Sequence, residues 1–356
     1  MADAASSRRP PPPRPPVPIA LWRELYSAAV EFQQLAPWEW MADADILGVN
    51  NAHGVRLISV LGANREVFGS ASYRGTVGTN FLLELLAGDQ DPEDTETMYR
   101  QDAVLVDFVP RKQLQEPDEI LIQQMRFQPA PGSPKRFPEF QSHRPGYLPW
   151  FVDAAEARMI LDDIRHLLPF ARLLRDHPGL YDGRRREDEF PFHPQAPAGE
   201  LTAAQLEWHR MVPAPPPPEP PPILAEFDVA ALRQARQLPD RNWESLTFFG
   251  DPLVEEGVDR PFFPHLSLVV DERTGMVLAV HLGQAGWTAA QCTAAALAGA
   301  IQKHGVRPGQ VRLDDPKLQS RLDGAATLLG LEFQVVEYLP MAAAARAAFE
   351  AHGPFL

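Results

Sequence analysis

Apolar positions recur at helical spacing near the start of the chain. They are Leu21, Leu25, Ala28, Phe32 and Leu35. Steps of three or four positions place such side chains on one face of a helix. Pro18 stands just ahead of this run, where proline is tolerated because the first N–H groups of a helix have no intrahelical partner. We therefore expect an opening amphipathic helix.

Short apolar runs separated by polar breaks follow this helix and predict a small sheet. Strands are expected at 45–49, 55–62, 66–75 and 103–109. N-N-A-H-G, between the first two runs, is a hairpin signal. Helices are expected at 76–86, at 117–127 and after Asp153, which forms a capping box with Glu156. The aromatic stretch 137–151 is expected to be irregular.

The last part of the chain has a clearer pattern. H-L-S-L-V-V-D and M-V-L-A-V-H-L-G flank the turn E-R-T-G and predict a hairpin. Thr288 and Gln291 form a capping box for a helix that Gly305 ends. Two further strands and two further helices follow. The order is ββαβαβα, and the segment from Trp243 to Phe249 can add a strand in front.

Two proline tracts divide the chain. The sequence holds 38 prolines in 356 residues, about twice the usual ~5%. One tract runs from Arg8 to Pro18 and the other from Pro213 to Pro222. Such tracts form no core and act as spacers, or as docking segments for aromatic grooves. The expected parts are a disordered tail, an N-terminal domain, a proline-rich linker and a C-terminal domain, at 1–17, 18–181, 182–222 and 223–356.

The fold class that these patterns predict is α+β in two domains. The N-terminal domain is expected to be an antiparallel sheet with helices. The C-terminal domain is expected to be a mixed sheet in the ββαβαβα order.

Charge and cysteine content narrow the class of function. The formal net charge is −14, which disfavours general affinity for nucleic acid or an anionic membrane. The single cysteine, Cys292, rules out an intramolecular disulfide and a cysteine-based zinc site. The first residues have no apolar signal region. We expect a cytoplasmic protein that binds neither nucleic acid nor membrane.

An acidic and aromatic stretch is the first candidate site. A-P-W-E-W-M-A-D-A-D gathers Trp38, Glu39, Trp40, Asp43 and Asp45. Aspartates two positions apart on an extended segment point to one side, and carboxylates suit divalent cations. The alternative is structural. In that interpretation the tryptophans close the core at the joint between the first helix and the sheet, and an aspartate caps a turn.

A proline-braced loop is the second candidate. In S-H-R-P-G-Y-L-P-W, Arg144 can clamp a phosphate or carboxylate, and Tyr147 and Trp150 can stack on a planar ligand. The alternative is a loop that covers a sheet edge, with Arg144 paired to Glu39, Asp43 or Asp45. Both interpretations predict that this loop meets the acidic stretch.

Sequence signatures of common enzymes are missing. The chain has no G-x-S-x-G, H-E-x-x-H, phosphate loop or G-x-G-x-x-G. Cys292 stands among alanines on a predicted helix, as a small core residue does. His265 and His281 lie on adjacent predicted strands, but a third ligand is not evident. We therefore expect no cofactor and no bound metal.

Several motifs resemble an uncharacterised bacterial two-domain family. They are L-W-R-E-L-Y-S-A-A-V-E-F, L-A-P-W-E-W-M and F-Q-S-H-R-P-G-Y-L-P-W-F in the first domain, and V-V-D-E-R-T-G, H-G-V-R-P-G-Q-V and L-G-L-E-F-Q-V in the second. The resemblance implies two domains of unknown function and supplies no activity.

The C-terminal order also resembles a degenerate RNase H-like fold. There R-P-x-x-V-x-x-D leads to a catalytic aspartate, which Asp314 would match. Paired metal ions need further carboxylates, and only Glu337 or Glu350 could serve as another. The sequence therefore favours a non-enzymatic protein-interaction or regulatory module with a protein partner. Two alternatives stand beside it. One is a ligand or metal site in the N-terminal domain, with or without hydrolytic activity, and the other is a degenerate nuclease.

Overall fold

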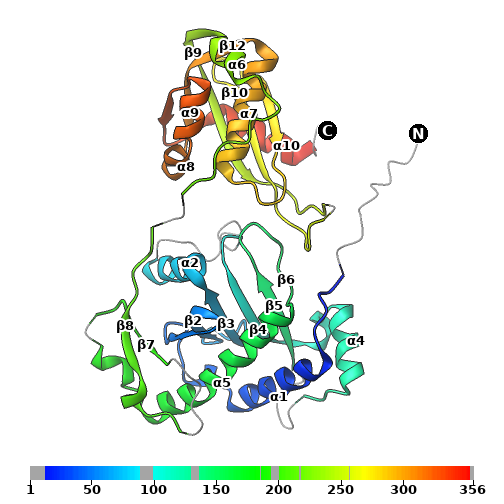
Figure 1. Ribbon diagram of the computed structural model, residues 1–356, viewed down its shortest axis with the longest axis vertical. Coiled ribbons are helices and arrows are strands. Elements are labelled where there is room, and N and C mark those ends of the chain that lie inside the picture. The colour runs from blue at the N-terminus through cyan, green and yellow to red at the C-terminus, as the bar shows by residue number, and fades with distance from the viewer. Residues whose placement is uncertain are drawn as a thin grey trace. The chain divides into compact units, whose positions relative to one another are not determined.

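The computed structural model describes residues 13–88, 99–129, 136–184, 186–193, 200–215, 218–255 and 257–352. The chain divides between Pro216 and Pro217 into two compact units. We describe each unit by itself (Figure 1). None of the helices in these ranges is both long enough and apolar enough to cross a bilayer.

The N-terminal unit is built on an eight-stranded sheet in the order β6-β5-β4-β3-β2-β1-β7-β8. Its strands are β1 (Leu47–Asn51), β2 (Gly54–Leu61), β3 (Gly69–Arg74), β4 (Ala103–Pro110), β5 (Arg136–His143), β6 (Trp150–Phe151), β7 (Glu189–Phe192) and β8 (Glu207–Arg210). Neighbouring strands are antiparallel, except that β7 runs parallel to β1.

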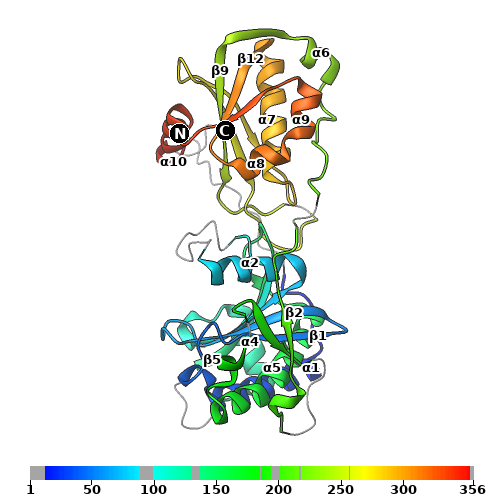
Figure 2. The same ribbon diagram turned by 90° about the vertical axis from the view of Figure 1, so that its left-hand side faces the viewer.

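Helices cover both faces of this sheet. They are α1 (Ile19–Leu35), α2 (Gly75–Ala87), α4 (Glu116–Met125) and α5 (Ala154–Asp176), with short 3-10 turns at Pro37–Glu39, Arg111–Gln113, Leu180–Gly183 and Ala203–Gln205. α1 and α5 pack against each other and share one core cluster with one face of the sheet, and α2 packs on the other face (Figure 2).

The two faces follow from alternation along the strands. In β2, Ile58 and Val60 belong to the cluster under α1 and α5, whereas Leu57 belongs to the cluster under α2. Successive side chains of a strand point to opposite faces, so a strand covered on both sides is apolar at nearly every position. The expected capping box at the start of α5 is confirmed, since Asp153 and Glu156 each accept a backbone hydrogen bond from the other.

The C-terminal unit holds a five-stranded mixed sheet in the order β11-β10-β9-β12-β13. Its strands are β9 (Arg236–Phe249), β10 (His265–Asp271), β11 (Val277–Leu282), β12 (Val306–Leu313) and β13 (Phe333–Val335). Its helices are α6 (Val229–Gln234), α7 (Ala289–His304), α8 (Pro316–Arg321), α9 (Asp323–Leu329) and α10 (Pro340–His352). β10 is antiparallel to β9 and β11, and β12 is parallel to β9 and β13.

The faces of this sheet are covered unequally. α7 packs on one face with α6, α8 and α9 around it, in a core cluster that includes Val269 and Val311. α10 contacts β9 and β10 on the other face, where Leu266 and Leu268 pack against Leu339 and Ala342. The expected α+β class and mixed C-terminal sheet are therefore confirmed.

Two expectations about local structure need correction, and one optional strand is confirmed but is longer than expected. Residues 136–143 form a regular strand, β5, because they pair with β4 along its whole length. The stretch expected as a linker contributes β7 and β8 to the N-terminal sheet, and Met211 packs on its core. The optional strand ahead of the C-terminal hairpin is β9, which is 14 residues long and lies at the centre of its sheet.

Candidate functional site

The two tryptophans of the acidic stretch lie at the edge of the N-terminal core. The ring of Trp38 packs edge-on against Phe32 and Phe68, with centroids 5.7 Å away in both cases. The indole N–H of Trp40 donates to the backbone oxygen of Ala171 at 3.1 Å. Trp38 also lies 5.6 Å from the ring of Phe108 on β4. These contacts tie the joint after α1 to α5 and β4, which agrees with the structural interpretation of the stretch.

The acidic residues of the stretch act locally. The carboxylate of Asp45 accepts a hydrogen bond from the backbone N–H of Ala42 at 2.8 Å, and so caps a turn. Burial raises the pKa of Asp45, and this hydrogen bond acts in the opposite direction. The backbone oxygen of Asp43 accepts from Ser59 at 2.7 Å. Glu39 lies in the short 3-10 turn that follows α1.

Arg144 lies elsewhere, and its expected pairing with the acidic stretch is wrong. It forms ion pairs with Glu156, at 3.5 Å, and with Asp153, at 3.9 Å. The loop that carries Arg144, Tyr147 and Trp150 joins β5 to the edge strand β6, whereas the acidic stretch leads into β1. Four strand spacings separate β5 from β1, which is roughly 19 Å at ~4.8 Å per strand.

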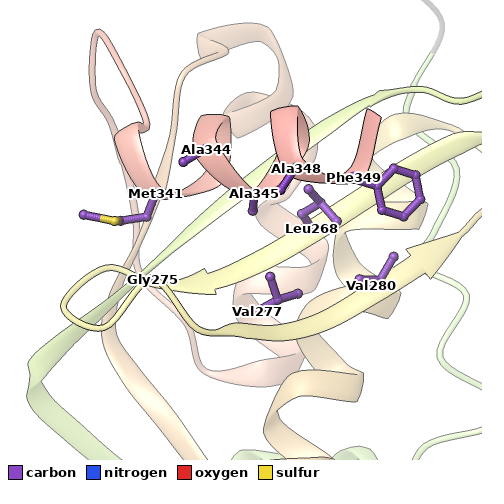
Figure 3. Close-up of a pocket in the computed structure, with 9 residues that line it drawn as sticks. All are labelled: Leu268, Gly275, Val277, Val280, Met341, Ala344, Ala345, Ala348 and Phe349. Atoms are coloured by element: carbon purple, nitrogen blue, oxygen red, sulfur yellow. The ribbon is translucent and has the colours of Figure 1, made fainter. Parts of the chain in front are cut away.

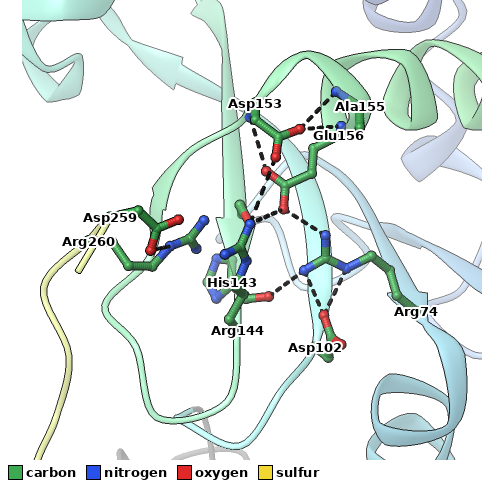
Figure 4. A network of polar contacts seen from close by, with 10 residues as sticks. Arg74, Asp102, His143, Arg144, Asp153, Ala155, Glu156, Asp259 and Arg260 are labelled. Atoms are coloured by element: carbon green, nitrogen blue, oxygen red, sulfur yellow. Dashed lines mark hydrogen bonds and ion pairs between the residues drawn. The ribbon is translucent and has the colours of Figure 1, made fainter. Parts of the chain in front are cut away.

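Arg144 stands instead beside a partly buried ion-pair network (Figure 4). The guanidinium of Arg74 donates to Asp102 at 2.8 Å, to Glu156 at 2.8 Å and to the backbone oxygen of His143 at 2.9 Å. Ser142 donates to the same Glu156 oxygen at 2.6 Å. The network ties β3, β5 and the first turn of α5 together.

The chemistry of this network is that of a structural clamp. Burial alone would raise the pKa of Glu156, but the hydrogen bonds from Ser142 and Arg74 outweigh it, and the pKa is lowered. The second oxygen of Glu156 accepts the backbone N–H of Asp153 at 3.0 Å. Because both oxygens are occupied and the carboxylate is held charged, Glu156 is poorly suited to accept a proton from a substrate.

A second buried cluster joins the β1–β2 hairpin to the middle of α5. Arg56 is fully buried and donates to Asp163 at 2.8 Å and to Asp162 at 2.9 Å. The ring of His166 is 5.6 Å from that of His193, and neither His166 nitrogen has a hydrogen-bond partner among the described residues. Burial lowers the pKa of His166 to about 4, so its imidazole is neutral at pH 7.

Metal-ligating side chains do not converge in the part of the chain that the structure describes. No group of three His, Cys, Asp or Glu residues there has the geometry to hold a metal ion. Cys292 is buried, and burial raises the pKa of its thiol to about 12. Its Sγ donates to the backbone oxygen of His265 at 3.2 Å, as expected of a core cysteine.

Glu244 is one of several buried carboxylates that the sequence did not indicate. Glu244 lies on the central strand β9 and accepts a hydrogen bond from the backbone N–H of Ala342 at 2.7 Å. It therefore holds the first turn of α10. The sequence did not indicate this burial because the strand was expected only from Trp243 onward. Glu244 then stands at the start of the expected strand, where a glutamate is normally exposed.

The surface of the C-terminal unit has an apolar groove of about 550 Å³ (Figure 3). One wall is α10, through Met341, Ala344 and Ala348, and the other is β11, through Val277 and Val280. Leu268 of β10 lies at the floor, and Phe349 and Gly275 also line the groove. No charged side chain is among the lining residues.

The groove exists because α10 leaves the edge strand uncovered. Val280 and Leu282 of β11 pair with Leu268 and Leu266 of β10, and paired residues share a face of the sheet. α10 buries the two leucines of β10, whereas Val280 and Leu282 remain 42% and 38% exposed. The apolar face of the sheet thus extends one strand beyond its helical cover.

Comparison with protein families agrees with the division of the chain. Residues 22–190 match a family model described as Domain of unknown function (DUF7309). Residues 228–350 match a second one, described as Domain of unknown function (DUF6930). The chain therefore matches two domains of unknown function, one in each unit, which is consistent with the resemblance of its motifs to an uncharacterised two-domain family. A search of curated proteins gave no match.

Proposed function

We propose that this protein is a non-enzymatic interaction module, and that the groove between α10 and β11 binds an amphipathic helix of a partner protein. The observation that carries the proposal is the uncovered apolar row on β11 beside the alanine face of α10. Exposed apolar surface of this kind is a mark of interaction sites when it is contiguous and concave.

The two flanks of α10 on the sheet differ in polarity. On the β12 side, the residues on the α10 face are Glu244, Arg312 and Gln334, which pair across β9, β12 and β13. On the β11 side they are Val277, Val280 and Leu282. A sheet face in contact with water is normally polar. The flank on the β12 side therefore has the composition of a solvent-exposed face, whereas the flank on the β11 side has the composition of a face that another apolar element covers.

The edge strand itself lacks the usual protection. β11 reads V-L-A-V-H-L and carries no lysine, glutamate or proline. β8, an edge strand of the other sheet, reads E-W-H-R. Edge strands that must remain alone are normally blunted by charge or proline, so the composition of β11 favours an element that docks beside it.

A helix fits the geometry of this groove better than an extended peptide. The exposed valines and the leucine point to the face of the sheet, and not along its edge. Packed helices lie ~8–10 Å apart and strands ~4.8 Å apart, so one helix covers about two strands. α10 lies over β9 and β10, which places the next helical position over β11, and Ala344 and Ala348 allow close approach.

Selection from a displayed library of helical peptides tests the proposal. We expect selected peptides to carry large aliphatic side chains at i, i+3 or i+4, and i+7, and to lose at least tenfold in affinity for the Val280→Glu variant. Val212→Glu is a matched control, because Val212 is exposed in the N-terminal unit. Equal binding to both variants would refute the groove. Sedimentation of the chain alone detects self-association, which would contradict a foreign helix as the occupant.

The cellular setting belongs to the same proposal. We place the protein in a bacterial cytoplasm, on the support of its single cysteine. A protein partner is part of the proposal, and the net charge of −14 favours one over nucleic acid or an anionic membrane.

A further inference from the structure

Arg14, from the first proline tract, is docked into the N-terminal unit. Its guanidinium carbon lies 4.6 Å from the ring centroid of Trp22 and 4.9 Å from that of Phe151. Its Nη1 donates to the carboxylate of Asp118 at 2.9 Å and to the backbone oxygen of Pro117 at 3.3 Å. The side chain of Arg14 is 14% exposed. An arginine outside any helix or strand is thus held between two aromatic rings and a carboxylate.

The surroundings of Arg14 hold a second buried carboxyl group besides that of Asp118. Asp118 and Glu139 are both buried, at 2% and 8% exposure. Burial raises the pKa of Glu139 to about 7, with a further contribution from the charge of Asp118. Oδ2 of Asp118 and the hydroxyl of Tyr26 have no hydrogen-bond partner among the described residues. Acceptor capacity therefore remains after Arg14 is bound.

Donor capacity remains as well. Nε and Nη2 of Arg14 have no hydrogen-bond partner among the described residues. A guanidinium offers five N–H donors, so the docked arginine is recognised mainly by charge and by the faces of Trp22 and Phe151. An interior arginine selected only for stability would normally have its donors satisfied.

The segment around Arg14 is attached by little else. In P-R-P-P-V-P, four of six residues are prolines, which lack a backbone N–H and adopt extended polyproline II. The prolines at 13, 16 and 18 are exposed, and Val17 packs at the rim of the core. The arginine side chain is therefore the chief anchor of a segment that no sheet or helix retains.

We propose that the cradle formed by Trp22, Phe151 and Asp118 is a peptide-binding site for arginine flanked by prolines, presented by a partner protein, and that Arg14 is its internal ligand. The arrangement has the elements of proline-rich recognition, namely aromatic faces for an extended segment and a carboxylate for its basic residue. This site lies in the N-terminal unit and does not depend on the groove of the C-terminal unit.

The internal ligand Arg14 lowers the apparent affinity of the cradle for a partner peptide. A short tether gives a docked segment an effective concentration of the order of millimolar. A partner peptide of similar intrinsic affinity therefore binds weakly while Arg14 occupies the cradle. The same peptide binds strongly once the Arg14 side chain is removed. Release of Arg14 also exposes the rings of Trp22 and Phe151, so occupation in cis keeps an aromatic surface covered.

The test uses the full-length chain and the capped, fluorescently labelled peptide P-R-P-P-V-P. We expect the Arg14→Ala variant to bind this peptide at least tenfold more tightly than the native chain does, by fluorescence anisotropy. The same peptide with lysine in place of arginine should bind more weakly, because an ammonium lacks the planar stacking surface. Adding Asp118→Asn to Arg14→Ala should abolish binding. Arg23→Ala, an exposed change on α1, should behave like the native chain.

Two results would overturn the proposal. One is equal peptide binding to the native chain and to Arg14→Ala, and the other is unchanged binding when alanine replaces the arginine of the peptide. Ethylguanidinium covers the case in which Arg14→Ala is unstable. It should raise the melting temperature of that variant more than ethylammonium does, and no difference would again count against the site. A concentration-dependent dimer of the native chain that Arg14→Ala abolishes would identify a second copy, and not a foreign partner, as the source of the arginine.

Discussion

Glu244 and Ala342 connect the centre of the C-terminal sheet to the start of its last helix. The carboxylate on β9 accepts the backbone N–H of Ala342 at 2.7 Å, and the Glu244 side chain is 1% exposed. The first N–H groups of a helix lack intrahelical partners, and a negative charge at this end also interacts favourably with the helix dipole. This contact fixes the position of α10, and with it one wall of the groove.

Replacement of Glu244 should therefore destabilise the C-terminal unit. Glu244→Ala leaves a buried N–H without its acceptor, and we expect the free energy of unfolding to fall by about 2–4 kcal/mol. Glu244→Gln keeps an acceptor oxygen and should cost less than half as much. Urea denaturation followed by circular dichroism measures both values. Equal losses for the two variants would show that the contact with Ala342 is not the reason for the burial of Glu244.

The ion-pair network at Arg74 predicts a large and position-specific loss. Arg74→Ala removes the closer of the two arginines that pair with the buried Glu156, at 2.8 Å against 3.5 Å for Arg144, and loss of one partner of a buried ion pair typically costs about 3–5 kcal/mol. Arg111→Ala is the matched control, because Arg111 pairs with Glu119 at the surface, and an exposed pair contributes about 0–1 kcal/mol. Denaturant titration of both variants checks the contrast. Comparable losses would contradict the role of Arg74 as a clamp between β3, β5 and α5.

Glu156 also predicts a pH dependence of stability. Its pKa is lower in the folded chain than in the unfolded one, so its contribution is fully present above the unfolded value, ~4.3. That contribution is lost as the pH falls through the folded pKa. Ser142→Ala removes one of the hydrogen bonds that lower the pKa. The difference in unfolding free energy between native and variant chains should shrink between pH 5 and the acid limit, and a constant difference would contradict this account.

His166 predicts a separate acid sensitivity with the same sign. Burial lowers its folded pKa to about 4, so below pH ~6.5 the unfolded chain binds a proton that the folded chain does not. Stability is therefore lost between the unfolded and folded pKa values as the pH falls. Asp163 acts in the opposite direction, because burial raises its pKa to about 6, and Arg56, Asp162 and His193 face the same cluster.

One variant separates the proton binding of His166 from that of its titratable neighbours. His166→Gln removes the titrating ring and retains a polar side chain. The free energy of unfolding, measured from pH 7 to pH 4.5, should fall less steeply for His166→Gln than for the native chain. His209→Gln serves as the control, because His209 is exposed on β8. Parallel curves for native chain and His166→Gln would show that His166 does not bind protons differently in the two states.

The sequence predicted the helices and strands whose signals lie within a few consecutive residues. β1 to β4 were visible from their apolar runs, and α5 from the Asp153–Glu156 capping box, because each signal lies within a few residues. β9 carries R-Q-L-P-D-R-N ahead of Trp243, and its extended form depends on pairing with β10 and β12 on both sides. β7 and β8 are likewise defined by pairing, within a stretch whose composition resembles a linker.

Contacts between residues on different strands could not be predicted without the strand order, which no local sequence pattern contains. Arg144 needed an anion, as its sequence context indicated, but Glu156 and Asp153 at the start of α5 provide it. Arg14 lay in a tract expected to be a tail, and its docking depends on Asp118, 104 positions away. The turn role of Asp45 was accessible from sequence because its partner Ala42 is three positions away, whereas the contacts of Trp38 and Trp40 at the edge of the core include Phe68 and Ala171, which are distant in sequence.

The alanine face of α10 gives the sharpest test of the groove. Ala348 lines the groove, whereas the exposed neighbour Ala347 does not. Ala348→Leu should fill the space that a docking helix needs, and so lower the affinity of a selected helical peptide at least tenfold. Ala347→Leu adds the same atoms to the same helix outside the groove, and should leave that affinity within twofold.

Stability separates steric blocking from unfolding in this comparison. Alanine and leucine differ by only about 0.2 kcal/mol in helix propensity, and both sites are exposed. The unfolding free energies of the two variants should therefore agree within about 0.5 kcal/mol, with Ala348→Leu the higher if its side chain contacts Val280. Peptide affinity measured by fluorescence anisotropy should separate the variants although their stability does not. If both variants bind alike, the helix does not dock against this face of α10, and the uncovered row on β11 requires another occupant.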